Sequence, residues 1–210
     1  MRWPIAQHVP AATTRNLSTL IPSPQPHGTI CHHMPLSEQE AANTLELLDS
    51  SLEKLKSLTA GLSVEQWHHR PTPEAWSPAE VVAHLRTADE VILGRIEAML
   101  TGPESAAEML EKTVGQEARL LRHVPNRARR VPAPLDMIPQ VIAKTPEEGL
   151  AELAAVRERA KAMLSRPGLQ VRVFPHFGLG PLTAYQWLIL IGVHSLRHAA
   201  QIEEALSAGV

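Results

Sequence analysis

The 210-residue sequence predicts an all-α protein, a four-helix bundle with a long crossover between the second and third helices. Two observations support this fold: helix-start signals recur at four places, and each is followed by apolar residues at helical spacing. In the capping box, a hydroxyl side chain accepts a hydrogen bond from the backbone N–H three residues on, and the acid or amide there reaches back. The four pairs are Ser37 with Glu40, Ser77 with Glu80, Thr145 with Glu148 and Thr183 with Gln186.

The first two helices are expected over residues 37–60 and 78–100. Pro78 suits the first position of the second helix, where no N–H is needed. Each helix carries one apolar stripe that would face its partners. The stripe of the first helix is Leu45, Leu48, Leu52 and Leu55, and that of the second is Val81, Leu85, Ala88, Val91, Ile92, Ile96 and Met99.

The last two helices are expected over residues 146–164 and 183–206. The fourth is apolar nearly all round from Leu188 to Val193, so we expect it to be the most buried. Between the second and third helices, residues 101–144 predict a helix near 104–121 and then a crossover punctuated by proline. Only Leu169 to Phe174 is compatible with a strand, and nothing else indicates a sheet.

Residues 1–35 differ from the rest of the chain. They are rich in proline, lack acidic residues and show no regular apolar period. We interpret them as a disordered extension or, because Met34 precedes the first helix signal, as a mis-called translation start. The Cys31-His32-His33 cluster is read as part of this polar tract rather than as a metal site. The folded domain is therefore expected over residues 36–210.

Composition excludes several functional classes. The formal net charge is −2 and no basic stripe is present, so nucleic acid is not an expected partner. No apolar run reaches the roughly 18–20 residues that span a bilayer, so no membrane association is expected. The lone Cys31 cannot form an intramolecular disulfide, which favours a reducing compartment. We therefore expect a soluble, cytoplasmic protein.

Three histidines stand out in the two most apolar helices. His194 and His198 are four residues apart, so both rings project from one helix face, on the stripe that also holds Trp187 and Ile191. His84 lies among the apolar residues of the second helix. Imidazoles that enter an apolar interior are costly unless a partner satisfies them. A divalent metal ion is such a partner, and three ligands leave positions open for water or substrate.

Motifs in the second and fourth helices resemble the DinB-like superfamily, and within it the DinB_2 branch that also contains the YfiT-type proteins. They are Trp76-Ser77, Glu80-Val81, His84-Leu85, Gly180-Pro181-Leu182-Thr183, Trp187-Leu188, His194, Arg197-His198 and Gln201-Ile202. The Pro-rich crossover that ends in 145–148 and the Arg157 region of the third helix are similar too. The resemblance covers about residues 37–207.

This resemblance implies a four-helix bundle, often a homodimer, in which His84, His194 and His198 hold one nickel, zinc or similar ion. Manganese and iron also suit three imidazoles. Characterised relatives are thiol-linked enzymes, namely transferases that use bacillithiol or mycothiol and the mycothiol-dependent maleylpyruvate isomerase. Other members are called metal-dependent hydrolases. Many relatives carry Glu directly after the first histidine of the fourth helix, where this chain has Ser195.

Three functions follow as hypotheses. The leading one is a metal-dependent thiol S-transferase that takes a small-molecule thiol and an electrophilic substrate. The alternative is a metal-dependent hydrolase of a small substrate, whose general base would be Asp89, Glu90 or Glu80. The third is a non-catalytic metal-binding or stress-response protein, which three ligands disfavour because structural zinc usually takes four.

Residues beside the three histidines have two interpretations each. Gln201 either orients a ligand ring or bound water, or is an ordinary polar residue near a helix end. His176 either lines the mouth of the cleft or lies in a loop. The cluster Arg127, Arg129 and Arg130 either meets an anionic cofactor or substrate, or is a solvated loop. Trp76 and Trp187 are expected to anchor the core, and His68 and His69 to lie exposed between helices.

Overall fold

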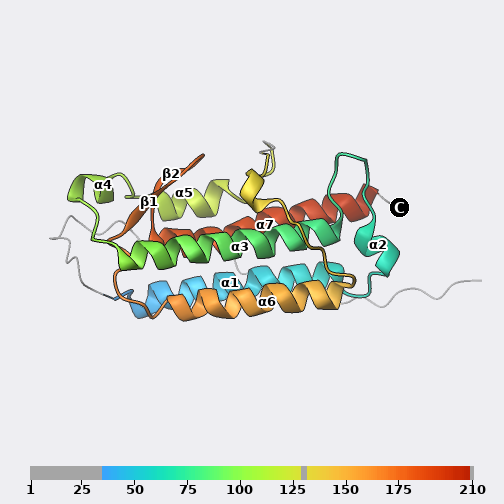
Figure 1. Cartoon of the computed structure of the whole chain (residues 1–210), viewed down its shortest axis with the longest axis horizontal. Coiled ribbons are helices and arrows are strands. Elements are labelled where there is room, and N and C mark those ends of the chain that lie inside the picture. The colour runs from blue at the N-terminus through green and yellow to red at the C-terminus, as the bar shows by residue number, and fades with distance from the viewer. Residues whose placement is uncertain (1–34, 129–131, 209–210) are drawn as a thin grey trace, which may run out of the picture.

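Four long helices run along the long axis of the molecule (Figure 1). The structure, a computed structural model, describes residues 35–128 and 132–208. The long helices are α1 (Glu38–Thr59), α3 (Pro78–Thr101), α6 (Pro146–Met163) and α7 (Ala184–Ala208). Helices α1 and α3 each pack against both α6 and α7, so α1 and α3 lie diagonally across the bundle. The predicted four-helix bundle is confirmed, with helix ends within two residues of those expected.

The capping signals act as the sequence predicts. Ser37, Ser77 and Thr183 each accept a hydrogen bond from the backbone N–H three residues on, and the side chain there accepts one in return. Thr145 accepts from the Glu148 N–H at 3.3 Å, but the Glu148 carboxylate binds the N–H of the preceding residue instead of closing the box. These caps set where α3 and α7 begin, and hence how far along each helix the histidines lie.

A fifth capping box, between Ser63 and Gln66, begins the short helix α2 (Val64–His68), which the sequence analysis missed. Its Trp67 is fully buried and donates from Nε1 to the carbonyl of Ala143 at 3.1 Å. A Cβ at Gly149 would lie 3.0 Å from the Trp67 ring, so α6 passes close beside it. Helix α2 therefore closes one end of the bundle and fixes the end of the crossover.

The crossover is folded over its described residues, 102–128 and 132–145, and the single helix expected near 104–121 is wrong. Two short helices replace it, α4 (Ala107–Glu111) and α5 (Gln116–His123). Gly115 separates them with φ 79°, a left-handed conformation that glycine adopts without steric cost. Helix α5 packs on α7, and a 3₁₀ turn η2 (Leu135–Met137) packs on α3. The crossover therefore forms a wall above the two histidine-bearing helices.

A two-stranded antiparallel hairpin leads into α7, where the sequence analysis expected at most one strand ending at Phe174. Strand β1 (Val173–His176) pairs with β2 (Gly180–Thr183), with His176 opposite Gly180. Pro175 and Pro181 face each other in this pairing. Proline donates no ladder hydrogen bond, so the sequence pattern argues against a strand. A two-stranded hairpin tolerates it, because each strand has an open edge.

Burial confirms the apolar character of α7 and corrects one stripe. Residues 184–193 of α7 are all buried. In α1, Leu45 is 37% exposed and Leu47 is buried instead, because the inward face runs through Thr44, Leu48 and Ser51. At Gly192, an added Cβ would lie 2.6 Å from Leu47 Cγ, so the lack of a side chain allows α1 and α7 to approach closely.

A buried arginine connects all four long helices. Arg157 of α6 is fully buried and donates from Nε to Asp89 of α3 at 2.6 Å and from Nη1 to Ser51 of α1 at 3.2 Å. Its Nη2 donates to the Ile191 carbonyl and to Ser195, both on α7. Burial raises the pKa of Asp89 to about 6, although Arg157 opposes the shift. Asp89 and Ser195 therefore belong to the interior of the bundle.

Within the described residues, no helix is long and apolar enough to cross a membrane. The expectations for residues 1–34, including Cys31-His32-His33, lie outside the described residues.

Candidate metal centre

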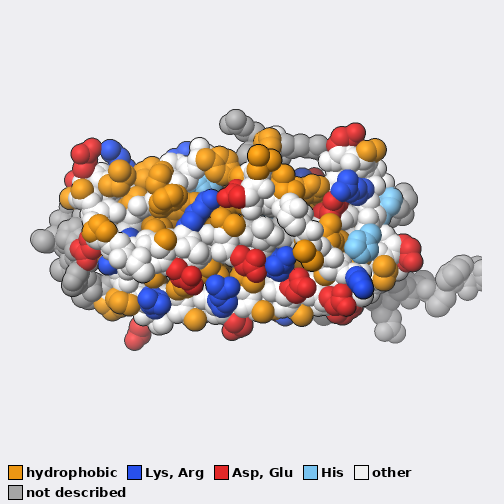
Figure 2. Space-filling model, in the orientation of Figure 1, with side chains coloured by type: hydrophobic (Ala, Val, Ile, Leu, Met, Phe, Trp, Pro, Cys, Tyr) orange, Lys and Arg blue, Asp and Glu red, His pale blue; other side chains and the backbone are white. Residues whose placement is uncertain are grey.

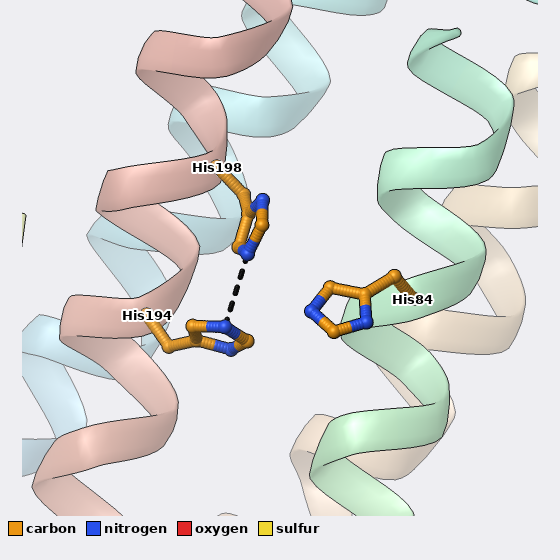
Figure 3. A group of neighbouring side chains, drawn as sticks. All are labelled: His84, His194 and His198. Atoms are coloured by element: carbon orange, nitrogen blue, oxygen red, sulfur yellow. Dashed lines mark hydrogen bonds between the residues drawn. The ribbon is translucent and has the colours of Figure 1, made fainter. Parts of the chain in front are cut away.

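The three histidines singled out from the sequence come together between α3 and α7. His194 and His198 point from α7 toward His84 on α3 (Figure 3). Nε2 of His194 and Nε2 of His198 lie 3.0 Å apart, and the His84 ring centroid lies 5.2 Å and 4.8 Å from theirs. One nitrogen from each ring lies within 4.8 Å of the others. The i, i+4 spacing and the packing of α3 on α7 are therefore sufficient to assemble the cluster.

Hydrogen bonds fix the tautomers of two of these rings. His84 Nδ1 lies 2.8 Å from the Met137 carbonyl oxygen, which can only accept, so Nδ1 carries the proton. His198 Nδ1 lies 2.9 Å from Gln201 Oε1. That amide oxygen also accepts from Arg127 Nη1 at 3.1 Å, and arginine cannot accept, so the atom facing both groups is oxygen. Both rings therefore turn an unprotonated Nε2 toward the cluster.

Burial keeps the three imidazoles neutral. It lowers the pKa of His84, it lowers that of His198 to about 3, and it lowers the pKa of His194 well below the usual value. The neighbouring histidines and arginines add to the shift at His194 and His198, because nearby positive charge disfavours a further proton. The cluster thus offers lone pairs rather than positive charge.

The donor set fits a divalent metal ion. Two nitrogens that each lie about 2.0–2.1 Å from one ion are about 2.8–3.4 Å apart for bond angles near 90–110°. The 3.0 Å between His194 and His198 falls in this range. Carbonyl oxygens that accept from the outer ring nitrogens, as Met137 and Gln201 do, are the usual support of metal-bound histidine. The role of these three residues as ligands stays a prediction.

The cluster lies on the wall of a cleft of about 910 Å³. Its lining changes along α7. On the hairpin side of the histidines it is apolar, with Trp187 and Leu190 on α7 and Phe177 on the hairpin loop. On the C-terminal side it is polar, with Gln201 and Glu204. The histidines thus occupy the middle of an asymmetric cleft.

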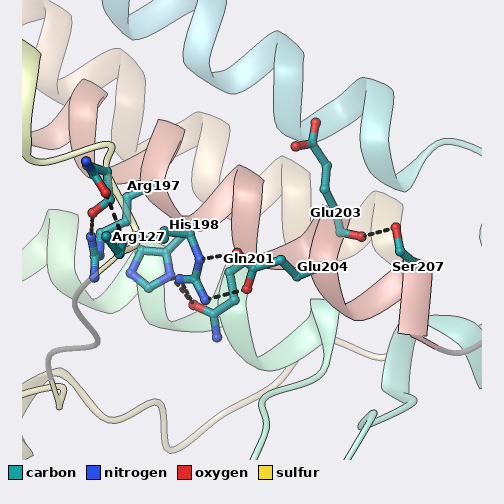
Figure 4. Close-up of polar contacts among 9 residues, drawn as sticks. Arg127, Arg197, His198, Gln201, Glu203, Glu204 and Ser207 are labelled. Atoms are coloured by element: carbon teal, nitrogen blue, oxygen red, sulfur yellow. Dashed lines mark hydrogen bonds and ion pairs between the residues drawn. The ribbon is translucent and has the colours of Figure 1, made fainter.

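The polar end is organised by Arg127, which the sequence analysis left open between a ligand contact and a solvated loop. Its guanidinium binds both carboxylate oxygens of Glu204 at 2.9 Å and donates to Gln201 (Figure 4). Arg197 donates to the carbonyls of Val124 and Asn126, which fixes the adjacent crossover. Gln201 therefore contacts His198, one of the three clustered histidines (the triad), which agrees with the interpretation that it orients a ligand ring. Arg129 and Arg130 lie outside the described residues.

None of the three carboxylates considered as a general base lines the cleft. Asp89 is fully buried against Arg157. Glu80 caps α3 and pairs with Arg70, which lowers the pKa of Glu80 despite its burial. Glu90 is exposed and pairs with Arg86. Each of the three carboxylates therefore pairs with an arginine outside the cleft, and none is placed to act as a general base at the histidines.

The remaining residues of interest lie as follows. His176 lines the cleft, the first of its two interpretations. Trp187 is fully buried in the core, as expected. Trp76 is half-buried and also lines the cleft, with its ring 5.0 Å from His84, a contact that the sequence analysis missed. His68 and His69 are exposed, as expected.

Fold and cluster together define a helical-bundle protein with a candidate three-histidine metal centre in a cleft. The chain belongs to the DinB superfamily, whose family model matches residues 47–202. It is 31% identical over 151 residues to the uncharacterized protein YuaE of Bacillus subtilis (strain 168). This match covers 69% of this chain and 85% of YuaE.

Among solved structures, the fold is similar to that of YfiT from Bacillus subtilis. The TM-score is 0.54 at 22% identity, over 85% of this chain and 93% of YfiT. YfiT is described as a probable metal-dependent hydrolase with an unusual four-helix bundle topology. At this level of identity the likeness supports the fold alone.

Proposed function

We propose that His84, His194 and His198 bind one divalent metal ion and that the protein is a metal-dependent thiol S-transferase. The observation that carries this proposal is the set of neutral imidazoles whose Nε2 atoms converge in an open cleft. Nickel and zinc both suit such a donor set. The bound ion would supply the acidity that converts a thiol into a thiolate near neutral pH.

The carboxylates of the cleft favour thiol chemistry over hydrolysis. Among the described residues that line the cleft, the carboxylates are Glu74, exposed at the rim, and Glu204, held by Arg127. Water attack benefits from a positioned general base. A thiol that ionises on a metal needs none.

A metal-dependent hydrolase is the second candidate, and it is supported by the description of YfiT. The same three ligands would lower the pKa of a bound water toward neutrality. A non-catalytic role is disfavoured because structural zinc sites usually take four protein ligands.

Cobalt substitution tests the proposal, because thiolate bound to Co²⁺ gives a strong charge-transfer absorption. We expect this band to appear when the cobalt-loaded protein is titrated with bacillithiol or cysteine, and to be lost in His84→Ala. The exposed His68 provides the matched control, and His68→Ala should behave as wild type. No band with any thiol, together with turnover of an ester or amide in its absence, would favour the hydrolase instead.

A further inference from the structure

The apolar end of the cleft contains one polar ring, that of His176, between two aromatic side chains. His176 stacks on Phe177 with ring centroids 4.5 Å apart and lies 5.2 Å from the Trp187 ring. Phe177 is exposed at the tip of the hairpin, whereas Trp187 is buried in α7. The His176 ring is therefore part of an aromatic wall that the hairpin and α7 build together.

Two backbone groups fix the tautomer of His176. Its Nδ1 accepts from the N–H of Gly178 at 3.0 Å and from the N–H of Leu179 at 3.2 Å. An atom that accepts two N–H bonds carries no proton, so the proton of the neutral ring is on Nε2. Among the described residues, none forms a hydrogen bond with Nε2. This atom is also not among the polar atoms enclosed in the protein interior. His176 thus presents a fixed N–H donor that is open to the cleft.

The surroundings keep this donor neutral and leave it available. Burial, with a smaller contribution from Arg95, lowers the pKa of His176 to about 4. Arg95 itself lies over the Trp187 ring at 5.6 Å and pairs with Asp136. Trp187 Nε1 donates to the Phe174 carbonyl at 3.3 Å. The nearby donors are therefore engaged, while His176 Nε2–H is not. Hydrophobic side chains also gather over the upper part of the face in Figure 2, above α3.

We propose that this end of the cleft is a binding subsite for an aromatic or conjugated carbonyl compound, whose oxygen accepts a hydrogen bond from His176 Nε2. The flat ring would pack against Phe177, which is 67% exposed and lines the cleft, as apolar pockets with few fixed polar groups usually bind ligands. His176 would be the residue that selects a ligand with an acceptor over one without.

The position of the subsite along α7 agrees with an electrophile for the proposed transferase, so this part of the inference rests on the proposed function. Trp187 precedes His194 by seven residues, or about two helical turns and about 10 Å along the axis. The His176 ring contacts the Trp187 ring, so a ligand bound to His176 would lie about two helical turns from the three histidines. Conjugated carbonyl compounds are electrophiles that thiolates attack.

Two probes of similar shape test the subsite without turnover. Acetophenone has a ring and a carbonyl oxygen, and ethylbenzene has the ring alone. Dissociation constants are measured by titration of the zinc-loaded full chain, followed in ¹H–¹⁵N spectra. We expect wild type to bind acetophenone about fivefold more tightly than ethylbenzene, since a neutral hydrogen bond is worth a factor of about two to ten.

The variants separate the hydrogen bond from the packing. His176→Phe keeps a stacked ring but lacks the donor, so it should bind both probes equally. His176→Gln supplies an amide N–H and should retain part of the preference. Phe177→Ala should weaken both probes while the preference remains. Two results would overturn the proposal. One is a preference for acetophenone in His176→Phe that equals that of wild type, and the other is equal binding of the two probes by wild type.

The same titration of His84→Ala separates this inference from the proposed function. We expect the preference for acetophenone to persist without the metal. A preference that disappears in His84→Ala would place the carbonyl on the metal and overturn the subsite. A missing cobalt–thiolate band alongside an intact probe preference would instead reject the transferase and leave the subsite standing.

Discussion

Replacing Gln201 with leucine should weaken metal binding, although Gln201 is not a proposed ligand. The amide oxygen accepts from His198 Nδ1 at 2.9 Å and from Arg127 Nη1 at 3.1 Å. Arg127 is in turn held by both oxygens of Glu204. This chain of contacts keeps the His198 proton on Nδ1 and its Nε2 lone pair toward the cluster. Leucine removes the acceptor and leaves a buried N–H without a partner.

The magnitude follows from the position of His198, which is 8% exposed. Loss of a partner that supports a metal-bound histidine typically lowers metal affinity about 10–100-fold, or about 1.4–2.7 kcal/mol. We expect Gln201→Leu to fall in this range. Arg127→Met should cost less, about tenfold or below, because Gln201 can still accept from His198.

Competition with a chromophoric chelator measures the zinc affinity of each variant, and long-range ¹H–¹⁵N correlations of the metal-free protein report the His198 tautomer. The matched control is Lys54→Met, which removes an exposed ion pair with Glu203 on another face of α7 (Figure 4 shows Glu203). Its affinity should equal that of wild type. A Gln201→Leu protein with wild-type affinity and an unchanged tautomer would refute this reasoning.

Three further predictions concern stability. Arg157→Met should lower the free energy of unfolding by about 3–5 kcal/mol in urea titrations, because this substitution leaves the fully buried Asp89 unpaired. The control Arg159→Met, at an exposed pair with Glu97, should change the free energy of unfolding by less than about 1 kcal/mol. Gly192→Ala should be less stable than Gly94→Ala by about 1–3 kcal/mol, because the new methyl group at Gly192 would clash with Leu47. A Cβ at Gly94 would meet nothing within 4 Å. Equal stabilities of the two variants would contradict the close packing of α1 and α7. The folded-state pKa of His176, about 4, lies below the usual 6.5, so its neutral form contributes stability above pH 6.5 that is lost as the pH falls toward 4. Wild type should therefore lose more stability than His176→Phe between pH 7 and pH 4.5, and an NMR titration that gives His176 a pKa near 6.5 would contradict this.

Local signals explain why the helices and the triad could be predicted from the sequence. Ser37, Ser77 and Thr183 act through hydrogen bonds that reach only three residues along the chain. The spacing of His194 and His198 places them on one face by helix geometry alone. His84 stood out because it lies among the apolar residues of its own helix, and the family resemblance then placed it in one site with His194 and His198.

The errors arise where distant contacts decide the structure. Gly115 breaks the helix expected near 104–121, because α5 packs on α7 instead of continuing the line of α4. The hairpin was incomplete in the sequence analysis because Pro175 and Pro181 argue against strands, yet they pair across it. The bonds of Arg127 to Glu204 and Gln201 span more than 70 residues. No local pattern indicates such contacts.

The most direct test of the central claim is the metal content of the purified protein, measured by inductively coupled plasma mass spectrometry. We predict about one divalent metal ion per chain in wild type and in the control His68→Ala, and little or none in His84→Ala, His194→Ala and His198→Ala. Circular dichroism confirms that each variant is folded. Full metal retention in the folded triad variants would contradict a metal centre at His84, His194 and His198.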